Sequence, residues 1–463
     1  MVYENGKVSQ LKIAYIGGGS RGWAWMLMND LKQSSFMSGE VYLYDIDYNA
    51  AYDNEVIGNT IDGEGWRYKA TKTIGEALSG ASFVVISILP GTFDEMEYDV
   101  HAPEKYGIYQ SVGDTAGAGG FVRALRTIPM MRHIAASIRE HCPDAWVINY
   151  TNPMAASIGA LYREFPEIKA FGCCHEVFGT QWLLTRALKE VEGIENVRRN
   201  EIIINPIGVN HFTWFTSAKY QNIDLFKTYE KFIDRFYETG YSSGDINHWM
   251  NNSFACNERV KFDLFRRFGY IAAAGDRHLA EFMDADDYLA SPEVVRSWMF
   301  GLTPVSWRKR DLENRLARSK RLLSGEEKYR LHNSGEEGTL QMKALLGLDT
   351  MVTNVNIPNR GQIPNLPIGT IVETNAVFRA NSLQGVSSGE VPPSIYELIS
   401  RSAKENDYMV EAAFSLDLDY AFTLFSRLNM LKGLSKEDKK ALFTEMCRGS
   451  EKYLCDYRKG HIL

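Results

Sequence analysis

The stretch "KIAYIGGGSRG", residues 12–22, decides the fold class of this chain of 463 residues. Its apolar part, 12–16, has the pattern of a short buried strand, and an apolar, helix-like run follows the glycines. The glycines match the pattern G-x-G-x-x-G, which lets the backbone approach a pyrophosphate while the helix N-terminus supplies oriented N–H groups. The stretch therefore predicts a dinucleotide site formed by Gly17, Gly19, Ser20 and Gly22.

A second strand-like run, "EVYLYDID" at 40–47, places an acidic residue where such a site needs one. Asp45 lies about 23 residues beyond Gly22, close to the position from which a carboxylate binds the ribose hydroxyls. A carboxylate at this position favours NAD(H) over a cofactor with a 2′-phosphate. The alternative is a glycine turn in some other α/β sheet.

Strand-like and helix-like runs alternate further along the chain. Strands are expected within 81–91, 145–153 and 168–174, and an amphipathic helix over 128–142. This alternation predicts an α/β fold with a parallel, doubly wound sheet, which binds ligands beyond the carboxyl ends of its strands. We expect a Rossmann-like NAD-binding domain over 1–200. A larger, mainly helical α+β domain of the lactate and malate dehydrogenase type is expected over 201–463, with a lid or an interface at 351–378.

Composition and charge exclude several classes of function. The net charge of −7 gives no basic field for nucleic acid or anionic membrane, and no apolar run is long enough to span a bilayer. The first residues lack the features of a signal peptide. Six irregularly spaced cysteines then predict reduced thiols in a cytoplasmic protein.

Two short motifs carry residues that can bind a metal. The motif "FGCCHEVFG", 171–179, contains Cys174, and "GVNHF" contains His211. A thiolate and an imidazole from different loops could meet at a divalent metal, and two protein ligands would leave an exchangeable site better suited to Mn²⁺ than to structural zinc. The alternative is a buried cysteine and a core histidine.

Three further segments offer polar groups, each with a plain structural alternative. The glycine-rich segment 111–129 carries Asp114 and Arg126, and an arginine there could bind a carboxylate. Asn149 and Asn152 in "NYTNP" suit sugar hydroxyls, although Asn-Pro is also a common turn. In "AAAGDRHLAEF", 272–282, Asp276 and His278 are either loop residues or an acid–base group. The serine-hydrolase elbow, the Walker A motif and H-E-x-x-H do not occur in the sequence.

Taken in order, these motifs resemble those of glycoside hydrolase family 4, from about residue 12 to 290 and more loosely to the end. The version Cys174–Val177, Cys-His-Glu-Val, is similar to the subgroup that contains α-galacturonidases. His175 stands where subgroups acting on 6-phosphoglycosides have Asp or Asn, which argues against a phosphosugar substrate. The NAD-dependent enzymes of this family are exceptions to the two-carboxylate mechanism that most glycosidases use.

The resemblance implies hydrolysis by a redox-assisted elimination. NAD⁺ takes hydride from C3 of the sugar, a base removes the C2 proton beside a divalent metal such as Mn²⁺, and the C1–O bond breaks before water adds and the hydride returns. By this resemblance Cys174 and His211 are the metal ligands, Asn152 contacts a substrate hydroxyl, and Asp276 is the base. His175 and Asp114 are the candidates for the acid.

Several functions stay open at this point. The leading expectation is an α-galacturonidase that acts as a homodimer or homotetramer on a small sugar substrate. An α-glucuronidase or a neutral α-glycosidase of the same family is the first alternative. A net NAD-dependent hydroxy-acid dehydrogenase is a further alternative, followed by a non-catalytic NAD-binding protein.

Overall fold

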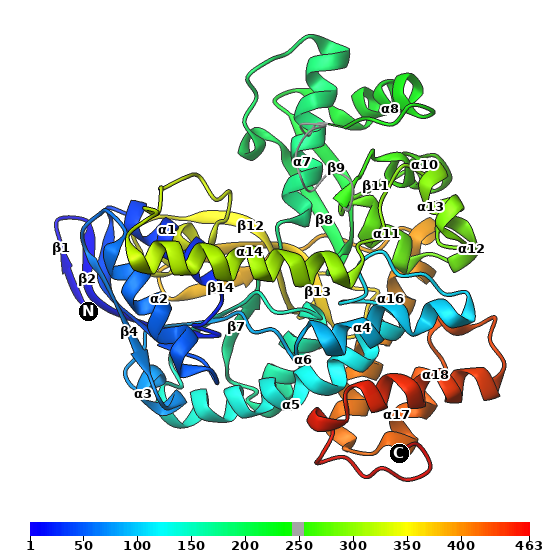
Figure 1. The fold of residues 1–463 in the computed structure, drawn as a ribbon. Helices are drawn as coiled ribbons and strands as arrows, with labels where there is room; N and C mark the ends of the chain where they lie inside the picture. Colours follow the sequence, from blue (N-terminus) through cyan, green and yellow to red (C-terminus); the bar gives the residue numbers. More distant parts are fainter. Residues whose placement is uncertain (243–253) are drawn as a thin grey trace.

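Six parallel strands form the centre of the molecule in the computed structural model, which describes residues 1–242 and 254–463 (Figure 1). They lie in the order β4-β3-β2-β5-β6-β7, so the chain builds outward in both directions from the β2–β5 pair. This is the arrangement of a doubly wound dinucleotide-binding sheet, and the predicted fold class is confirmed. The strands are β2 (Lys7–Ile16), β3 (Met37–Tyr44), β4 (Trp66–Thr71), β5 (Phe83–Ile86), β6 (Trp146–Asn149) and β7 (Lys169–Gly172).

Strands from the second half of the chain extend this sheet. β12 (Met351–Pro358) joins β7 in antiparallel fashion through the pair Asn356 and Gly172, and β13 (Ile371–Arg379) and β14 (Ser382–Gly385) follow at the edge. The strands expected within 351–378 are confirmed, but they belong to the main sheet rather than to a lid, and an interface there stays a prediction. At the N-terminus, β1 (Val2–Glu4) pairs with β2. The division into 1–200 and 201–463 stays a proposal.

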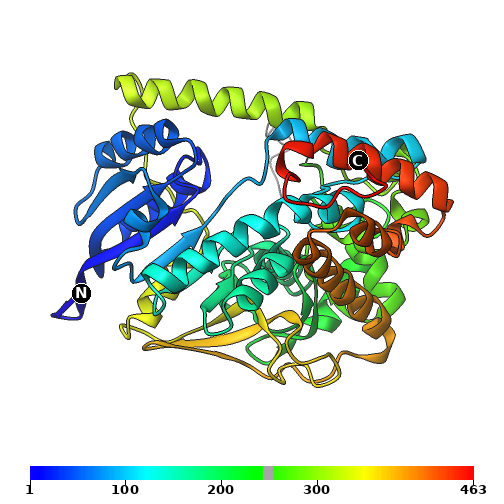
Figure 2. The same ribbon diagram turned by 90° about the horizontal axis from the view of Figure 1, so that it is seen from below.

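Helices cover both faces of the sheet, and each face has its own hydrophobic core (Figures 1 and 2). Alternate residues of one strand enter different cores: Ile13 and Tyr15 face one, whereas Ala14 and Ile16 face the other. This explains why the strands read as continuous apolar runs. One core includes α1 (Trp23–Gln33), α2 (Tyr48–Thr60) and α15 (Gly338–Leu345); the other includes α3 (Ile74–Leu78), α5 (Gly117–His141), α6 (Met154–Glu164), α16 (Pro393–Ser415), α17 (Leu418–Phe425) and α18 (Lys436–Gly449).

A smaller antiparallel sheet stands beside the main one, in the green upper part of Figure 1. Its strands β8 (Ile203–Val209) and β9 (Phe212–Tyr220) form a hairpin with a two-residue turn, Asn210 and His211. The backbone of His211 has a φ of 64°, in the left-handed region that few residues other than glycine adopt. The remaining elements of this region are β10 (Ile223–Asp224), β11 (Ile271–Ala272), α7 (Glu176–Ala187), α8 (Leu225–Phe236), α10 (Arg259–Phe268), α11 (Asp276–Phe282), α12 (Ala285–Tyr288) and α13 (Pro292–Ser297).

One long helix, α14 (Val305–Ser324), connects the two regions. It contacts α2 of the dinucleotide-binding half and α4 (Phe93–His101), and both views show it lying across the N-terminal helices (Figures 1 and 2). α14 therefore extends from α4 to α2 and the glycine turn. Among the described residues, no helix is long and apolar enough to cross a membrane.

Candidate active site

The predicted dinucleotide turn lies at the carboxyl end of β2. At two of its glycines, Gly17 and Gly19, there is no room for a side chain. Gly17 has a φ of 96°, and a Cβ added there would lie 2.0 Å from the carbonyl oxygen of Ser87. A Cβ on Gly19 would lie 2.6 Å from that of Ala50. Gly22 precedes α1 without any side-chain cap, so the N–H groups of the first turn face outward. The turn therefore has the close backbone and free donors that a pyrophosphate needs.

Asp45 fixes this turn from the end of β3. One carboxylate oxygen accepts a hydrogen bond from the Gly19 N–H at 2.9 Å, and the other accepts from the Asp47 N–H at 3.0 Å. Burial raises the pKa of Asp45, against the effect of these hydrogen bonds. Each oxygen keeps further lone pairs for ribose hydroxyls, so the residues present fit a dinucleotide.

A second set of polar side chains gathers at the carboxyl end of β7 and at the β8–β9 turn. We call Cys174, Glu176, Asn210, His211 and His278 the Cys174–His211 group. Burial, followed by the charges of Glu373 and Glu176, raises the pKa of the Cys174 thiol, which lies beside the Asn210 side chain. Both amide atoms of Asn210 are buried and have no hydrogen-bond partner among the described residues. A thiol in this setting needs a nearby cation to become a thiolate, so the donors fit a divalent metal.

His211 and His278 lie against one another in this group. Their ring centroids are 3.9 Å apart, and His278 Nε2 is 3.6 Å from a carboxylate oxygen of Glu176. The other oxygen of Glu176 accepts from the Gly275 N–H at 2.9 Å. Burial, reinforced by the charge of His278, lowers the pKa of His211 to about 3, which leaves a neutral imidazole able to bind a metal. His278 Nδ1 is buried without a partner in the described part of the chain.

Asp114 adjoins the group through Thr115. The Thr115 hydroxyl donates to Asp114 at 2.7 Å and lies 3.2 Å from Nδ1 of His211. Burial alone would raise the pKa of Asp114, but the charges of Arg123, His278 and Arg308 outweigh it and lower that pKa. Asp114 therefore stays ionised.

His175 and Asn152 lie at the margin of the group. His175, half exposed, has Nδ1 3.2 Å from a carboxylate oxygen of Glu336, and this hydrogen bond raises the pKa of His175 to about 9. Its ring stacks near Trp23, which directly follows the glycine turn. The buried Oδ1 of Asn152 has no partner in the described regions, whereas its carbonyl accepts from Arg123 Nε at 3.2 Å.

Two predicted substrate residues have structural roles instead. Both amide atoms of Asn149 hydrogen-bond to the backbone of Thr151 within one turn. Arg126 is fully buried and donates two hydrogen bonds to Asp99, at 3.0 and 2.6 Å, and one to Ser450. Because these partners occupy their polar groups, the geometry does not support either residue as a substrate ligand.

The structure also places Asp276 away from the group. Its fully buried carboxylate accepts hydrogen bonds from the N–H groups of Val260 and Lys261, at 3.2 and 3.1 Å, in the first turn of α10. It lies in a cluster with Cys256 and Glu258. Burial and the charge of Glu258 raise the pKa of Asp276 to about 7. This geometry favours His278 over Asp276 as the base, because the Asp276 oxygens accept hydrogen bonds from α10, and the role of Asp276 stays a prediction.

Sequence reasoning overlooked some residues of the site. Glu176 lies within the quoted motif and could have been found from its place beside Cys174 and His175. Thr115 and Arg308 carry no local signal, because only the fold brings them to Asp114.

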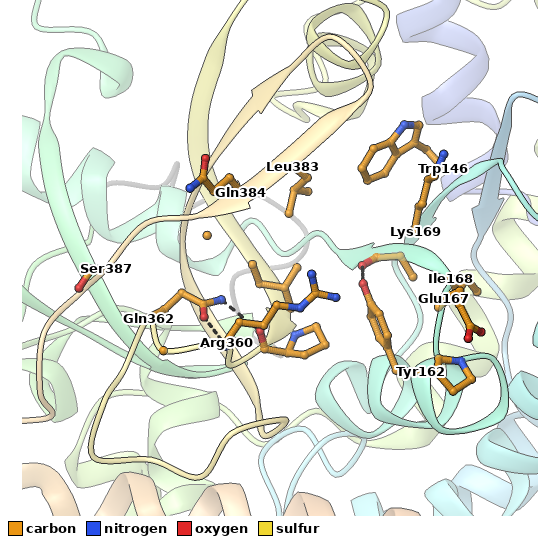
Figure 3. A pocket seen from close by; sticks show the side chains of 16 residues that line it. Trp146, Tyr162, Glu167, Ile168, Lys169, Arg360, Gln362, Leu383, Gln384 and Ser387 are labelled. Carbon is orange, nitrogen blue, oxygen red and sulfur yellow. Dashed lines mark hydrogen bonds between the residues drawn. The ribbon is translucent and has the colours of Figure 1, made fainter.

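A separate hollow of about 530 Å³ lies at the amino ends of β6 and β7, beside β12 and β14 (Figure 3). It forms where β7 and β12 diverge, and Trp146, Lys169, Arg360 and Gln384 are among its lining residues. None of the predicted site residues lines it. The hollow is therefore separate from the predicted site residues.

Comparison with known sequences gives matches along most of the chain. Residues 12–190 match the family described as "Family 4 glycosyl hydrolase", and residues 206–427 match its C-terminal domain. The alpha-galacturonidase of Thermoanaerobacterium saccharolyticum is 60% identical over 459 residues, covering 98% of each chain. That of Bacillus subtilis is 48% identical and covers 95% of this chain and 97% of its own.

Solved structures show the same fold. The crystal structure of Bacillus subtilis LplD superposes with a TM-score of 0.90 at 49% identity and covers 95% of this chain and all of its own. A 6-phospho-alpha-glucosidase from gut microorganisms, solved in complex with NAD and Mn²⁺, has a TM-score of 0.76 at 19% identity and covers 96% of this chain and 99% of its own.

Proposed function

This chain belongs to glycosyl hydrolase family 4 and is a glycoside hydrolase, and we propose that it cleaves α-D-galacturonides. The observation that carries the proposal is the full-length similarity, at 48 to 60% identity, to relatives named alpha-galacturonidase. The order of the site motifs supports it, since the relatives cover the whole of the Cys174–His211 group. α-Glucuronides and neutral α-glycosides are the alternatives.

We propose NAD and Mn²⁺, or another divalent metal, as the cofactors. Gly17, Gly19, Ser20, Gly22 and Asp45 would hold the dinucleotide, and Cys174 and His211 would bind the metal. When bound, the dinucleotide accepts and returns a hydride, and the metal places positive charge beside the sugar oxygens. A 6-phospho-alpha-glucosidase of the same fold has been solved with both.

The side chains of the protein itself handle the substrate and its protons. Asn152, with its free buried Oδ1, would accept a hydrogen bond from a sugar hydroxyl. The base that removes the proton at C2 would be His278, which Glu176 holds, rather than Asp276. For the acid at the C1 oxygen, position favours His175, because it is half exposed where a leaving group can reach solvent.

Hydrolysis of p-nitrophenyl α-D-galacturonide tests this proposal. We expect release of galacturonate only when NAD⁺, Mn²⁺ and a reducing thiol are all present. The α-D-glucuronide, its C4 epimer, and the α-D-galactoside, which lacks the carboxylate, should react at least about tenfold more slowly. Equal or faster reaction of either analogue would overturn the substrate assignment, and accumulation of NADH at 340 nm in proportion to substrate would show a net dehydrogenase.

The expected location and assembly are proposals as well. All six cysteines are unpaired, as in a reducing cytoplasm. We propose a homodimer or homotetramer, which light scattering of the purified protein would distinguish from a monomer.

A further inference from the structure

Arg308 lies on the first turns of α14 and has no ion-pair partner among the described residues. Its Nε is buried and has no hydrogen-bond partner in the part of the chain that the structure describes. A guanidinium that loses water without gaining a partner is costly, so such a group in a native protein calls for an explanation. An anionic ligand that completes the hydrogen bonds of Arg308 would supply one.

The surroundings of Arg308 place it at one end of the candidate active site. Its charge acts on Asp114, which contacts Thr115 and, through it, His211. It also lies near Asp311 and Glu281. Arg308 therefore lies near Asp114, which Thr115 connects to His211.

Two other arginines of this region already have hydrogen-bond partners. Arg277 donates to the carbonyl oxygens of Gly301 and Ser111, at 3.2 and 2.8 Å, and to the Thr303 hydroxyl. Arg123 donates to the Asn152 carbonyl and faces Asp114 most strongly of all its charged neighbours. Arg308 is therefore an arginine beside the ionised Asp114 whose Nε has no hydrogen-bond partner among the described residues, while burial raises the pKa of the nearby Glu281 to about 7.

The position of Arg308 along α14 separates it from the cofactor turn. Arg315 lies seven residues further along, about 10 Å away in a helix. It is Arg315 that donates to the Arg21 carbonyl and contacts Gly22 at the glycine turn. Arg308 therefore lies toward Asp114 on α14, whereas Arg315 lies at the glycine turn.

We propose that Arg308 binds the C6 carboxylate of the substrate and so selects uronides over neutral glycosides. This inference rests on the proposed function. With C2 and C3 of the sugar at the Cys174–His211 group, the C6 substituent lies across the ring, in the direction of Asp114 and Arg308. A planar guanidinium matches a carboxylate with two parallel hydrogen bonds.

The test compares p-nitrophenyl α-D-galacturonide with p-nitrophenyl α-D-galactoside in the holoenzyme. Arg308→Gln should lower kcat/KM for the galacturonide by about 100-fold, mainly through KM, and change that for the galactoside by less than about threefold. Arg308→Lys should recover part of the loss, since it keeps the charge without the planar fork. Calorimetry should show weaker binding of D-galacturonate by Arg308→Gln, with D-galactose binding unchanged. Arg310→Gln, an exposed arginine on the same helix, is the matched control.

The outcomes separate the two proposals. A wild-type enzyme that cleaves the galactoside but not the galacturonide would overturn the proposed function and this inference with it. A second outcome is that the wild type and Arg310→Gln both prefer the galacturonide while Arg308→Gln has the same ratio of kcat/KM values for the two substrates as the wild type. In that case only the role of Arg308 is overturned. An affinity of Arg308→Gln for D-galacturonate equal to that of the wild type would also overturn the role of Arg308.

Discussion

Asp276 and His278 are two residues apart on α11, yet their side chains occupy different surroundings. Asp276 accepts hydrogen bonds from the first turn of α10, whereas His278 contacts His211 and Glu176. Residues two apart on a helix point to nearly opposite sides. The motif therefore predicts that one of them reaches the site, but only the packing of α10 against α11 decides which.

Substitution of these two residues separates stability from catalysis. His278→Gln should lower kcat by at least about 100-fold with the melting temperature nearly unchanged, because a group that handles protons is lost. Asp276→Asn should keep most of the activity of the folded enzyme and lower the melting temperature, because the α10 amides keep only one oxygen acceptor. Steady-state kinetics beside thermal melts would decide, and a well-folded but inactive Asp276→Asn enzyme would restore Asp276 as the base.

Neighbouring cysteines provide a second contrast at this scale. Cys174→Ser should weaken Mn²⁺ binding by at least about tenfold and remove most activity, because a hydroxyl is a far poorer anionic ligand than a thiol. Cys173→Ser is the matched control, since the Cys173 thiol is buried and donates to Gln341 at 3.0 Å. Titration with Mn²⁺ followed by calorimetry measures both. Equal Mn²⁺ affinities for Cys174→Ser and the wild type would exclude Cys174 as a ligand.

At the scale of elements, α11 fixes the loop that carries Asp114. Glu281 accepts hydrogen bonds from the N–H groups of Val112 and Gly113, at 2.7 and 2.9 Å, and Arg277 donates to the Ser111 carbonyl. The loop before α5 is thus held by side chains from residues far along the chain. The position of this loop relative to His211 therefore depends on this contact as well as on Gly113 and Gly117, whose φ values are 71° and 64°.

This contact predicts a pH-dependent stability. Burial raises the pKa of Glu281 to about 7 from an ordinary value near 4.5, so folding takes up a proton between these values. The stabilisation that the protonated Glu281 adds to the unfolding free energy is fully present below about pH 4.5 and is lost as the pH rises to about 7. Glu281→Gln removes this dependence, so relative to the wild type it should gain on the order of 1 to 3 kcal/mol in unfolding free energy between pH 5 and pH 8.

Urea unfolding at the two pH values would measure this difference. Glu390→Gln, an exposed acid on a loop, serves as the control and should show the same pH dependence as the wild type. If the unfolding free energies of Glu281→Gln and the wild type changed equally between the two pH values, the raised pKa assigned to Glu281 would be contradicted.

The elements also show what sequence could predict. The glycine turn, Asp45 and the parallel strands followed from local patterns, because each depends on residues close in the chain. The Cys174–His211 group was partly predictable, since ordered motifs marked Cys174 and His211. The placement of β12 beside β7 and of α14 beside α2 was not, because contacts between distant segments leave no periodic signal.

At the scale of the whole molecule, the site lies between two regions that supply different ligands. The main sheet carries the glycine turn, and the smaller sheet carries His211. If NAD⁺ and Mn²⁺ bind as proposed, each should raise the melting temperature of the dialysed protein, because ligands that bind only the folded state stabilise it. Gly19→Val should abolish the increase from NAD⁺ and keep that from Mn²⁺, since its side chain would collide with Ala50.

Thermal melts with NAD⁺ alone and with Mn²⁺ alone would check whether the two ligands bind independently. The wild type in the same buffers is the control, and Cys174→Ser should show the reverse pattern. Loss of both increases in Gly19→Val, in a protein that melts cooperatively, would show that the two sites are not separable as described.

The central claim is that the protein cleaves an α-galacturonide after removing the proton at C2, rather than by direct displacement at C1. Hydrolysis of p-nitrophenyl α-D-galacturonide in D₂O tests it most directly, with the released galacturonate analysed by NMR. The account predicts deuterium at C2 of the product. Complete hydrolysis with only protium at C2 would contradict it.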